Sequence, residues 1–283
     1  MSPTKQIKHD EIGCWSEIKL DIIKEYASAY SRILSSQRTP SFHHVYIDGF
    51  AGTGQHRSKE TGEPISGSPL NALSLDPPFN EYYFIDLDGQ KVAELKRYED
   101  ERPNVHIYEG DCNIILLNEI FPLIKWEDYK RALCLLDPYG LHLKWDVLKK
   151  ASEMGTIEIF FNFSIMDANM NILWHDPKGV STDQVARMNE CWGDGSWKDI
   201  AYDTSGNLFG WPEKTDNRVI AEAFQERLKK VAGFGYVPKP IPMRNSNGAV
   251  IYYLYFASHK PVADEIVKQI FDKYRNRGVK DDF

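Results

Sequence analysis

The sequence predicts an α/β fold built on a doubly wound, Rossmann-like sheet of seven strands, one of them antiparallel. Short apolar runs rich in β-branched and aromatic residues alternate with helix-periodic runs between residues 42 and 163. Compact apolar runs of this kind are typical of parallel strands that are buried on both faces. A hairpin signal near the end of the chain then requires one strand to run against the others.

The first elements follow in order along the chain. An amphipathic helix is predicted over Trp15 to Leu34, because its apolar residues recur about every 3.6 positions. The five parallel strands are predicted at Phe42 to Ile47, Glu81 to Ile85, Val105 to Glu109, Ala132 to Leu136 and Ile157 to Phe163. The crossover helices are predicted at Pro69 to Leu75, Gly89 to Tyr98, Asn113 to Ile120 and Trp145 to Ala151. Ser68 is expected as the N-cap of the first of these, with Pro69 at its first helical position.

The pattern breaks after the fifth strand. Residues 164–216 are too many for an ordinary connection, and we interpret them as an insertion. Its four tryptophans, which either pack a small subcore or contact a substrate, are Trp174, Trp192, Trp197 and Trp211. The remaining elements are predicted as a helix at Val219 to Val231, strands at Tyr236 to Arg244 and Val250 to Ala257, and a helix at Pro261 to Tyr274.

The composition is that of a globular protein with a sizeable core. The chain has 283 residues, of which 42% are hydrophobic and 27% charged. We expect one domain, 1–283, made of an N-terminal helical extension (1–40), a half that binds a cofactor (41–163), the insertion (164–216) and a C-terminal part (217–283). The sequence shows neither an apolar run as long as a membrane helix nor a signal peptide.

The net charge bears on nucleic-acid partners, and the cysteine content bears on the cellular compartment of the protein. The net charge of −7 means that a nucleic-acid partner would need a local basic patch. His56, Arg57 and Lys59 could form one, or could belong to a solvated loop. The four cysteines are widely spaced, which fits reduced thiols in the cytoplasm. We expect no metal site, because the histidines offer no matched set of ligands, and buried cysteines such as Cys112 and Cys134 are usually inert.

A glycine-rich loop follows the first strand, in Asp48-Gly49-Phe50-Ala51-Gly52-Thr53-Gly54. Open α/β proteins bind ligands at this carboxyl edge of the sheet. A phosphate-binding Walker A loop would need Lys and Ser or Thr where Gln55-His56 stand. A dinucleotide fingerprint would need a small residue at Arg57. The type that remains is the Asp/Glu-x-Gly-x-Gly loop, whose backbone approaches the methionine part of S-adenosylmethionine; a tight turn without a ligand is the alternative.

Further carboxylates follow the next strands. Asp86 ends the second strand, where it could accept both ribose hydroxyls, and Asp111 follows the third, where it could accept the adenine amine. Either could instead cap a helix. The fourth strand ends in Asp137-Pro138-Tyr139-Gly140, which is also compatible with a simple turn. The predicted cofactor-binding residues are Asp48, Gly49, Phe50, Gly52, Gly54, Asp86, Asp111 and Cys112.

With these motifs, residues Phe42 to Ala257 resemble the class I S-adenosylmethionine-dependent methyltransferases. The whole chain looks like the three-Cys-motif partner protein (TcmP) family. The segments that carry this resemblance are Trp15 to Leu20, Asp48 to Gly54, Gly67-Ser68-Pro69, Phe84-Ile85-Asp86, Asp137 to Gly140 and Tyr253 to Ser258. The family name implies a companion protein with three motif cysteines, thought to resemble radical S-adenosylmethionine proteins.

The resemblance implies a methyltransferase that uses S-adenosylmethionine. Asp137-Pro138-Tyr139 resembles the Asp/Asn-Pro-Pro-Tyr/Phe motif of enzymes that methylate amines of nucleobases, which makes Asp137, Pro138 and Tyr139 the expected catalytic residues. One proline of that motif is absent here. The alternative is a non-catalytic accessory subunit that holds the cofactor for its companion.

Overall fold

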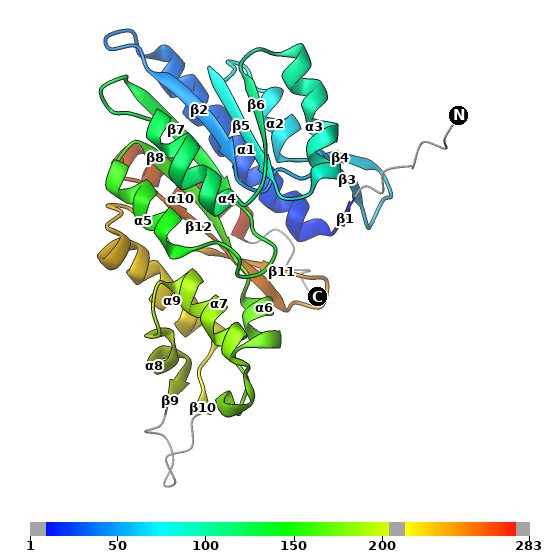
Figure 1. Ribbon diagram of the computed structural model, residues 1–283, viewed down its shortest axis with the longest axis vertical. Helices are drawn as coiled ribbons and strands as arrows, with labels where there is room; N and C mark the ends of the chain where they lie inside the picture. Colours follow the sequence, from blue (N-terminus) through cyan, green and yellow to red (C-terminus); the bar gives the residue numbers. More distant parts are fainter. Residues whose placement is uncertain (1–9, 204–212, 276–283) are drawn as a thin grey trace.

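The computed structural model describes residues 10–203 and 213–275. Seven strands form one sheet in the order β11-β12-β8-β7-β2-β5-β6 (Figure 1). Their bounds are β2 (His43–Asp48), β5 (Glu81–Asp86), β6 (Val105–Glu109), β7 (Lys130–Leu136), β8 (Ile157–Phe163), β11 (Ile241–Arg244) and β12 (Val250–Ala257). β12 is antiparallel to both of its neighbours, and the other pairs are parallel. The predicted fold class is confirmed, including the single reversed strand.

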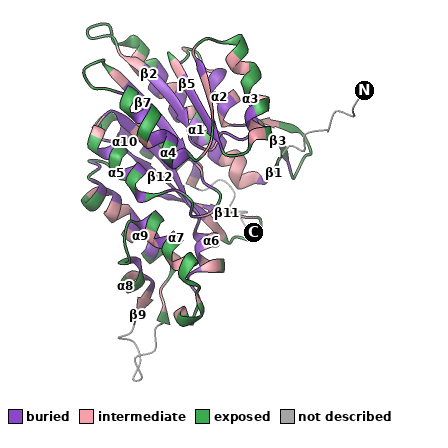
Figure 2. Cartoon of the chain, viewed as in Figure 1, coloured by how far each residue is buried: buried purple, intermediate pink, exposed green. Residues whose placement is uncertain are grey.

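Helices cover both faces of the sheet. Alternate strand residues point to opposite faces, so Tyr46 packs with one group of helices and Ile47 with the other. The first group comprises α1 (Cys14–Ser36), α2 (Ser68–Leu73), α3 (Gly89–Glu101) and α10 (Pro261–Arg275). The second comprises α4 (Cys112–Ile115) with its continuations η1 (Leu116–Ile120) and η2 (Phe121–Leu123), α5 (Trp145–Met154), α7 (Thr182–Trp192), and α9 (Asn217–Arg227) with η4 (Leu228–Ala232). Buried residues therefore run along the strands between the two layers (Figure 2).

The helix predicted before the sheet is α1. Its buried stripe includes Ile22, Ile23 and Tyr26, at the spacing the sequence predicted. Each fully buried side chain of this size contributes about 1.5–3 kcal/mol of transfer free energy. Lys19 lies on the same buried stripe, which places its ammonium group inside the protein.

The insertion contains α6 (Ile165–Asn171), η3 (Pro177–Gly179), α7, α8 (Trp197–Ala201), β9 (Tyr202–Asp203) and β10 (Glu213–Lys214). Trp192 and Trp197 belong to the main core, and the Trp192 ring lies 5.3 Å from that of Phe224. Both tryptophans therefore pack the core, which is one of the two roles that the sequence left open. Trp174 is exposed, and Trp211 lies outside the described residues.

The segment after the glycine loop differs from the prediction. β1 (Asp10–Ile12) pairs with β3 (Gln55–Ser58), which pairs with β4 (Pro64–Ser66). A small sheet thus follows the glycines where a dinucleotide fingerprint requires a helix. We expected the bulk of Arg57 to obstruct the packing of a helix. Arg57 lies on β3 instead, and no helix packs at this position.

Two local predictions are wrong. Ser68 is the first residue of α2, and Gly67 is its N-cap. A Cβ at Gly67 would lie 3.0 Å from the carbonyl oxygen of Gly54, so the capping position has no room for a side chain. The strand predicted from Tyr236 begins only at Ile241, because the prolines in the preceding segment cannot donate to the sheet.

Within the described residues, the longest helices are too short or too polar to cross a membrane.

A carboxyl group sits within β8. Glu158 accepts hydrogen bonds from the hydroxyls of Tyr26 and Ser258. Burial raises the pKa of Glu158 to about 7, although these hydrogen bonds and the charge of Lys260 oppose the shift. The pKa in the unfolded chain is about 4.3. The folded state therefore holds an extra proton between these values, and stability is lost as the pH rises from about 4 through about 7.

Glu158→Gln is expected to remove this loss. At about pH 8 the variant should be more stable than the wild type by about 1–3 kcal/mol, and at about pH 5 the difference should be smaller. Urea denaturation at both pH values measures this, with the exposed Glu153→Gln as control. If the free energies of unfolding of the wild type and Glu158→Gln differ by the same amount at both pH values, Glu158 does not titrate between them.

Candidate active site

A cavity of about 360 Å³ lies at the carboxyl edge of the sheet. Gly52 follows β2, Asp86 ends β5 and Asp137 to Tyr139 follow β7, and all of them line this cavity. The structure thus brings together three of the predicted strand ends. Lys19 and Tyr252, from α1 and β12, complete its wall.

Hydrogen bonds to neighbouring strands hold the glycine loop in place. The amide of Gly49 donates to the carbonyl of Leu135 at 2.9 Å, and that of Ala51 donates to Ile85 at 2.9 Å. Gly52 and Gly54 have φ of 66° and 79°, values that side chains other than glycine rarely allow. The conformation of the loop therefore requires glycine at positions 52 and 54, and Gly52 lines the cavity.

Asp48 lies beneath this loop and is fully buried. The amide of Phe50 donates to its Oδ1 at 3.2 Å, whereas its Oδ2 has no hydrogen-bond partner among the described residues. Burial raises the pKa of Asp48 to about 7. Asp48 is not among the residues that line the cavity, so a direct contact between its side chain and a cofactor stays a prediction.

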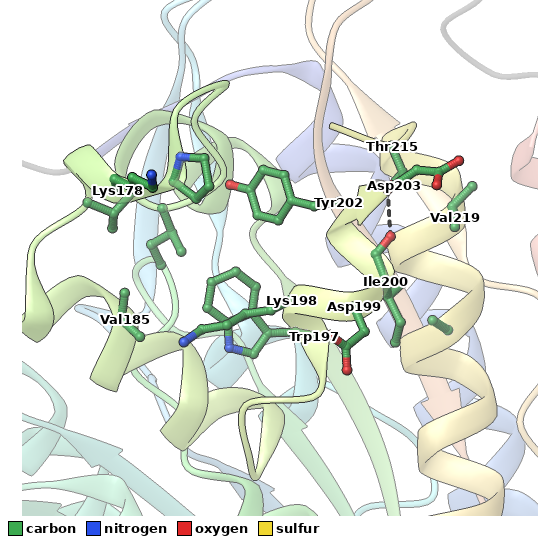
Figure 3. A pocket seen from close by; sticks show the side chains of 14 residues that line it. Lys178, Val185, Trp197, Lys198, Asp199, Ile200, Tyr202, Asp203, Thr215 and Val219 are labelled. Atoms are coloured by element: carbon green, nitrogen blue, oxygen red, sulfur yellow. Dashed lines mark hydrogen bonds between the residues drawn. The ribbon is translucent and has the colours of Figure 1, made fainter. Parts of the chain in front are cut away.

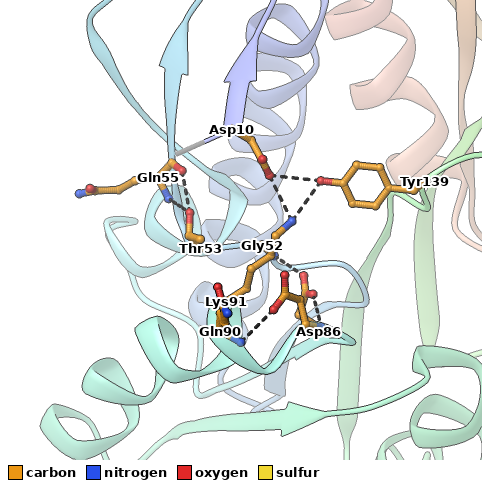
Figure 4. Close-up of polar contacts among 9 residues, drawn as sticks. Asp10, Gly52, Thr53, Gln55, Asp86, Gln90, Lys91 and Tyr139 are labelled. Atoms are coloured by element: carbon orange, nitrogen blue, oxygen red, sulfur yellow. Dashed lines mark hydrogen bonds and ion pairs between the residues drawn. The ribbon is translucent and has the colours of Figure 1, made fainter. Parts of the chain in front are cut away.

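Asp86 holds the glycine loop and borders the cavity. Its Oδ2 accepts from the amide of Gly52 at 2.8 Å, and its Oδ1 from the amide of Asp88 at 2.9 Å (Figure 4). The cap of α3 is Asp88 and not Asp86, because Asp88 accepts from Gln90. Each carboxylate oxygen of Asp86 can accept a further hydrogen bond, as the predicted contact with two ribose hydroxyls requires.

Asp111 and Cys112 are placed differently from the residues above. Neither is among the residues that line the cavity. Oδ1 of Asp111 accepts from the amide of Asn113 at 2.8 Å and so caps α4, which is the alternative role that the sequence left open. The side chain of Cys112 belongs to the core, so only its backbone could contact a cofactor. A contact between Asp111 and adenine stays a prediction.

Asp111→Asn separates these two roles. The amide oxygen of Asn can still cap the helix, so the melting temperature of the protein without ligand should barely move. One acceptor becomes a donor, and the affinity for S-adenosylmethionine should fall by about 5-fold, the effect of one hydrogen bond of about 1 kcal/mol. Calorimetric titration and thermal denaturation measure the two effects. A lower melting temperature at unchanged affinity would leave Asp111 with the capping role alone.

Asp137 is held by two side chains that the sequence prediction missed. Lys19 forms an ion pair with its Oδ2, and Asn162 donates to its Oδ1 at 2.8 Å. Burial alone would lower the pKa of Lys19, but the Asp137 carboxylate outweighs burial and raises it, so the ammonium stays charged. Two features of the sequence could have indicated these partners of Asp137. Lys19 stands among the apolar residues of α1, and Asn162 stands between two phenylalanines of β8.

Tyr139 presents its ring at the mouth of the cavity and is 69% exposed. Its hydroxyl lies 3.3 Å from Asp10 Oδ2 and 3.2 Å from Lys91 Nζ, and these two residues form an ion pair of 3.1 Å (Figure 4). Because Asp10 belongs to β1 and Lys91 to α3, the contact joins the strand-end loop to elements on the other side of the cavity. Most of the ring surface remains free for a flat partner.

The insertion supports the loop that carries Tyr139. Gly140 has φ of 66°, and a Cβ there would lie 2.6 Å from Oδ2 of Asp167. This carboxylate, on α6, accepts from the amide of Leu141 at 3.1 Å and pairs with Arg187 of α7 at 3.1 Å. This close approach requires glycine at position 140, because any side chain there would collide with Asp167 of the segment 164–216.

The proposed basic cluster is divided in the structure. His56 lines the cavity, and burial together with the charge of Lys19 lowers its pKa, so it is not a cation at neutral pH. Arg57 and Lys59 are exposed. Burial also raises the pKa of the Cys112 and Cys134 thiols. Across residues 10–203 and 213–275, no three His, Cys, Asp or Glu side chains form a group that could hold a metal ion.

A larger cavity, of about 890 Å³, lies between the segment predicted as an insertion and α9 (Figure 3). Trp197, Tyr202 and Val219 form part of its wall, and Lys178 and Lys198 are its cations. The hydroxyl of Thr215 donates to the carbonyl of Ile200 at 2.8 Å on one side. None of the predicted site residues lines it, so the candidate site is the smaller cavity at the edge of the sheet.

No family model and no curated protein matches the chain. Among solved structures, it is similar to protein LPL1258 from Legionella pneumophila str. Philadelphia 1, described with the family model DUF519. The TM-score is 0.52 at 13% identity, over 92% of this chain and 93% of that one. A putative S-adenosylmethionine-dependent methyltransferase from Listeria monocytogenes follows with a TM-score of 0.41 at 13% identity, over 86% and 99% of the two chains. At these identities the similarity concerns the fold alone.

Proposed function

We propose that the protein is an S-adenosylmethionine-dependent methyltransferase that acts on an amine of a nucleic-acid base. One observation carries the proposal. A single cavity is lined by Gly52 of the glycine loop, by Asp86, and by Asp137, Pro138 and Tyr139. Groups suited to a nucleoside and groups suited to an amine and a flat ring therefore face the same space.

The residues present fit S-adenosylmethionine. Asp86 has acceptor capacity left for the ribose hydroxyls, and Gly52 at the wall of the cavity leaves room for the backbone to approach the methionine part. The bound cofactor would supply an electrophilic methyl group. The chain itself would hold the two reactants in position, which can account for most of the acceleration in a transfer of this kind.

The acceptor side is formed by the loop after β7. Asp137 and the carbonyl of Pro138 would accept hydrogen bonds from the target amine, and the exposed ring of Tyr139 would stack on an extruded base. Transfer would form the methyl–nitrogen bond as the methyl–sulfur bond breaks, the sulfur would leave as a neutral thioether, and the proton of the amine would be released to solvent. The neighbouring ammonium of Lys19 gives Asp137 a fixed orientation.

We further place the chain in the three-Cys-motif partner protein family, as one cytoplasmic domain working with a three-Cys-motif companion. The support lies in the helix that carries part of the resemblance. Trp15, Ser16 and Lys19 line the cavity, so the segment Trp15 to Leu20 belongs to the candidate site and is not a remote extension. The companion itself is inferred only from the family resemblance.

One observation favours the alternative of a non-catalytic accessory subunit. Both oxygens of Asp137 already have partners, Lys19 and Asn162. If the ion pair persists when ligands bind, the charge of the Asp137 carboxylate stays directed at the Lys19 ammonium and not at a target amine. The protein would then hold the cofactor for its companion without transferring the methyl group.

Product analysis distinguishes the two functions. The purified chain would be incubated with methyl-tritiated S-adenosylmethionine and with transfer RNA or single-stranded DNA, with and without the companion. We expect S-adenosylhomocysteine and label in the nucleic acid, at levels that fall in the Asp137→Asn variant. Binding of the cofactor without either product under all these conditions would identify the accessory role.

A further inference from the structure

A third cavity, of about 410 Å³, lies at the amino edge of the sheet, opposite the candidate active site. It is enclosed by α1 and α10 and by the segments around the first residues of β7 and β8. It shares no lining residue with the cavity that contains Asp137. It is therefore a separate site on the molecule.

The wall of this cavity is mainly apolar. The aromatic and aliphatic side chains that line it are Tyr26, Tyr30, Ile33, Leu34, Phe42, Trp126, Ile157, Val262, Ala263 and Ile266. Concave apolar sites of a few hundred Å³ with a small number of polar groups are typical of places where proteins bind small molecules. The few polar groups determine which kind of molecule fits.

Arg131 is the main polar group in this wall. Only 8% of the residue is exposed, and its guanidinium carbon lies 3.9 Å from the ring centroid of Trp126 and 4.9 Å from that of Phe42. Nη1 donates to the carbonyl of Lys130 at 2.6 Å. Among the described residues no carboxylate pairs with the guanidinium, whose charge is thus stacked on aromatic rings and lacks a counter-ion.

The other charged side chains of the cavity do not neutralise Arg131. Lys260 adds a second cation, 5.1 Å from the ring centroid of Trp126. Glu158 is the one acidic residue in the lining, and Tyr26 and Ser258 already donate to its oxygens. A buried charge without a partner is costly, so an anion that pairs with Arg131 would remove this cost.

We propose that this cavity binds a small carboxylate that carries an apolar body, with the carboxylate on Arg131 and the body between α1 and α10. The planar fork of an arginine matches the two oxygens of a carboxylate. The two aromatic rings and the hydrogen bond of Nη1 hold the guanidinium in place, and its remaining N–H groups would donate to the carboxylate. This site goes beyond the proposed methyl transfer and does not depend on it.

Decanoate and 1-decanol are a matched pair of probes, because they share the chain length and differ in the charged group. We expect the full-length protein to bind decanoate at least about 10-fold more tightly than 1-decanol in calorimetric titrations. Arg131→Met should abolish most of this preference, and Arg131→Lys should retain part of it. The exposed Lys96→Met removes the same charge elsewhere and should change nothing. In amide NMR spectra, the shifts caused by decanoate should centre on Ile157 and Ala263.

Equal affinity for the two probes, or shifts centred away from Ile157 and Ala263, would overturn the proposal. The same holds if folded Arg131→Met retains the full preference for decanoate. If that variant does not fold, the comparison of the two probes on the wild type together with Arg131→Lys still decides. These experiments measure the binding of decanoate and 1-decanol. Their result therefore does not depend on whether the protein transfers a methyl group.

Discussion

Asp137→Asn is expected to reduce methyl transfer by about 100-fold or more while leaving the affinity for S-adenosylmethionine close to that of the wild type. Asp137 follows β7, beside the glycine loop, and would contact the acceptor and not the cofactor. An interaction that is made only in the transition state changes turnover and not cofactor binding. Calorimetry gives the affinity, and transfer of tritiated methyl to the identified acceptor gives the turnover.

Asparagine is preferred to alanine at this position because of Lys19. Lys19 is buried and the Asp137 side chain is 27% exposed, so removing the carboxylate leaves a buried ammonium without its counter-charge, at a cost of up to about 3–5 kcal/mol, the range for fully buried pairs. Asp137→Ala could therefore fail to fold for a reason unrelated to catalysis, whereas asparagine retains a polar partner for Lys19. Tyr139→Ala should lose transfer to a similar extent, and Tyr139→Phe, which keeps the ring, should retain most of it. Full transfer by both Asp137→Asn and Tyr139→Ala would contradict their catalytic role and direct attention to the insertion, 164–216.

Asp86→Ala is expected to weaken the binding of S-adenosylmethionine by about 10- to 150-fold. A hydrogen bond to a charged group contributes about 1.5–3 kcal/mol, and the variant also loses the contact that holds the amide of Gly52 at 2.8 Å. Asp86→Asn keeps one acceptor oxygen, so its affinity for S-adenosylmethionine should lie between those of Asp86→Ala and the wild type. Calorimetric titration measures all three proteins.

Asp88 provides a matched control for this experiment. Its side chain caps α3 two residues after Asp86 and is not among the residues that line the cavity. Asp88→Ala should lower the stability by about 1 kcal/mol through loss of the cap and leave the affinity unchanged. If Asp86→Ala binds the cofactor as well as Asp88→Ala does, Asp86 does not hold the ribose.

The strands of the main sheet could be predicted because their pattern is local. β6, β8 and β12 have the predicted bounds, and α1 extends the predicted helix by one residue at its start and two at its end. Runs such as Ala132 to Leu136 are apolar on both faces, and a strand buried on both faces leaves few alternative structures. The order of the strand ends along the chain then predicted which carboxylates would reach the carboxyl edge.

The remaining features depend on contacts between distant residues. Lys19 and Asp137 are 118 positions apart, and no local pattern links them. β1 and β3 are short and largely polar, so they form only because the chain brings them side by side. Asp111 caps α4 and Asp86 does not cap α3, although both are aspartates after a strand. That difference arises from Gly52 and Asp88, whose amides occupy the Asp86 carboxylate.

A calorimetric titration of the protein with S-adenosylmethionine decides whether it binds this cofactor. We expect saturable binding at one site, which S-adenosylhomocysteine prevents by competition and which Asp86→Ala weakens by about 10-fold or more. A folded wild-type protein that shows no binding of either compound would contradict this expectation.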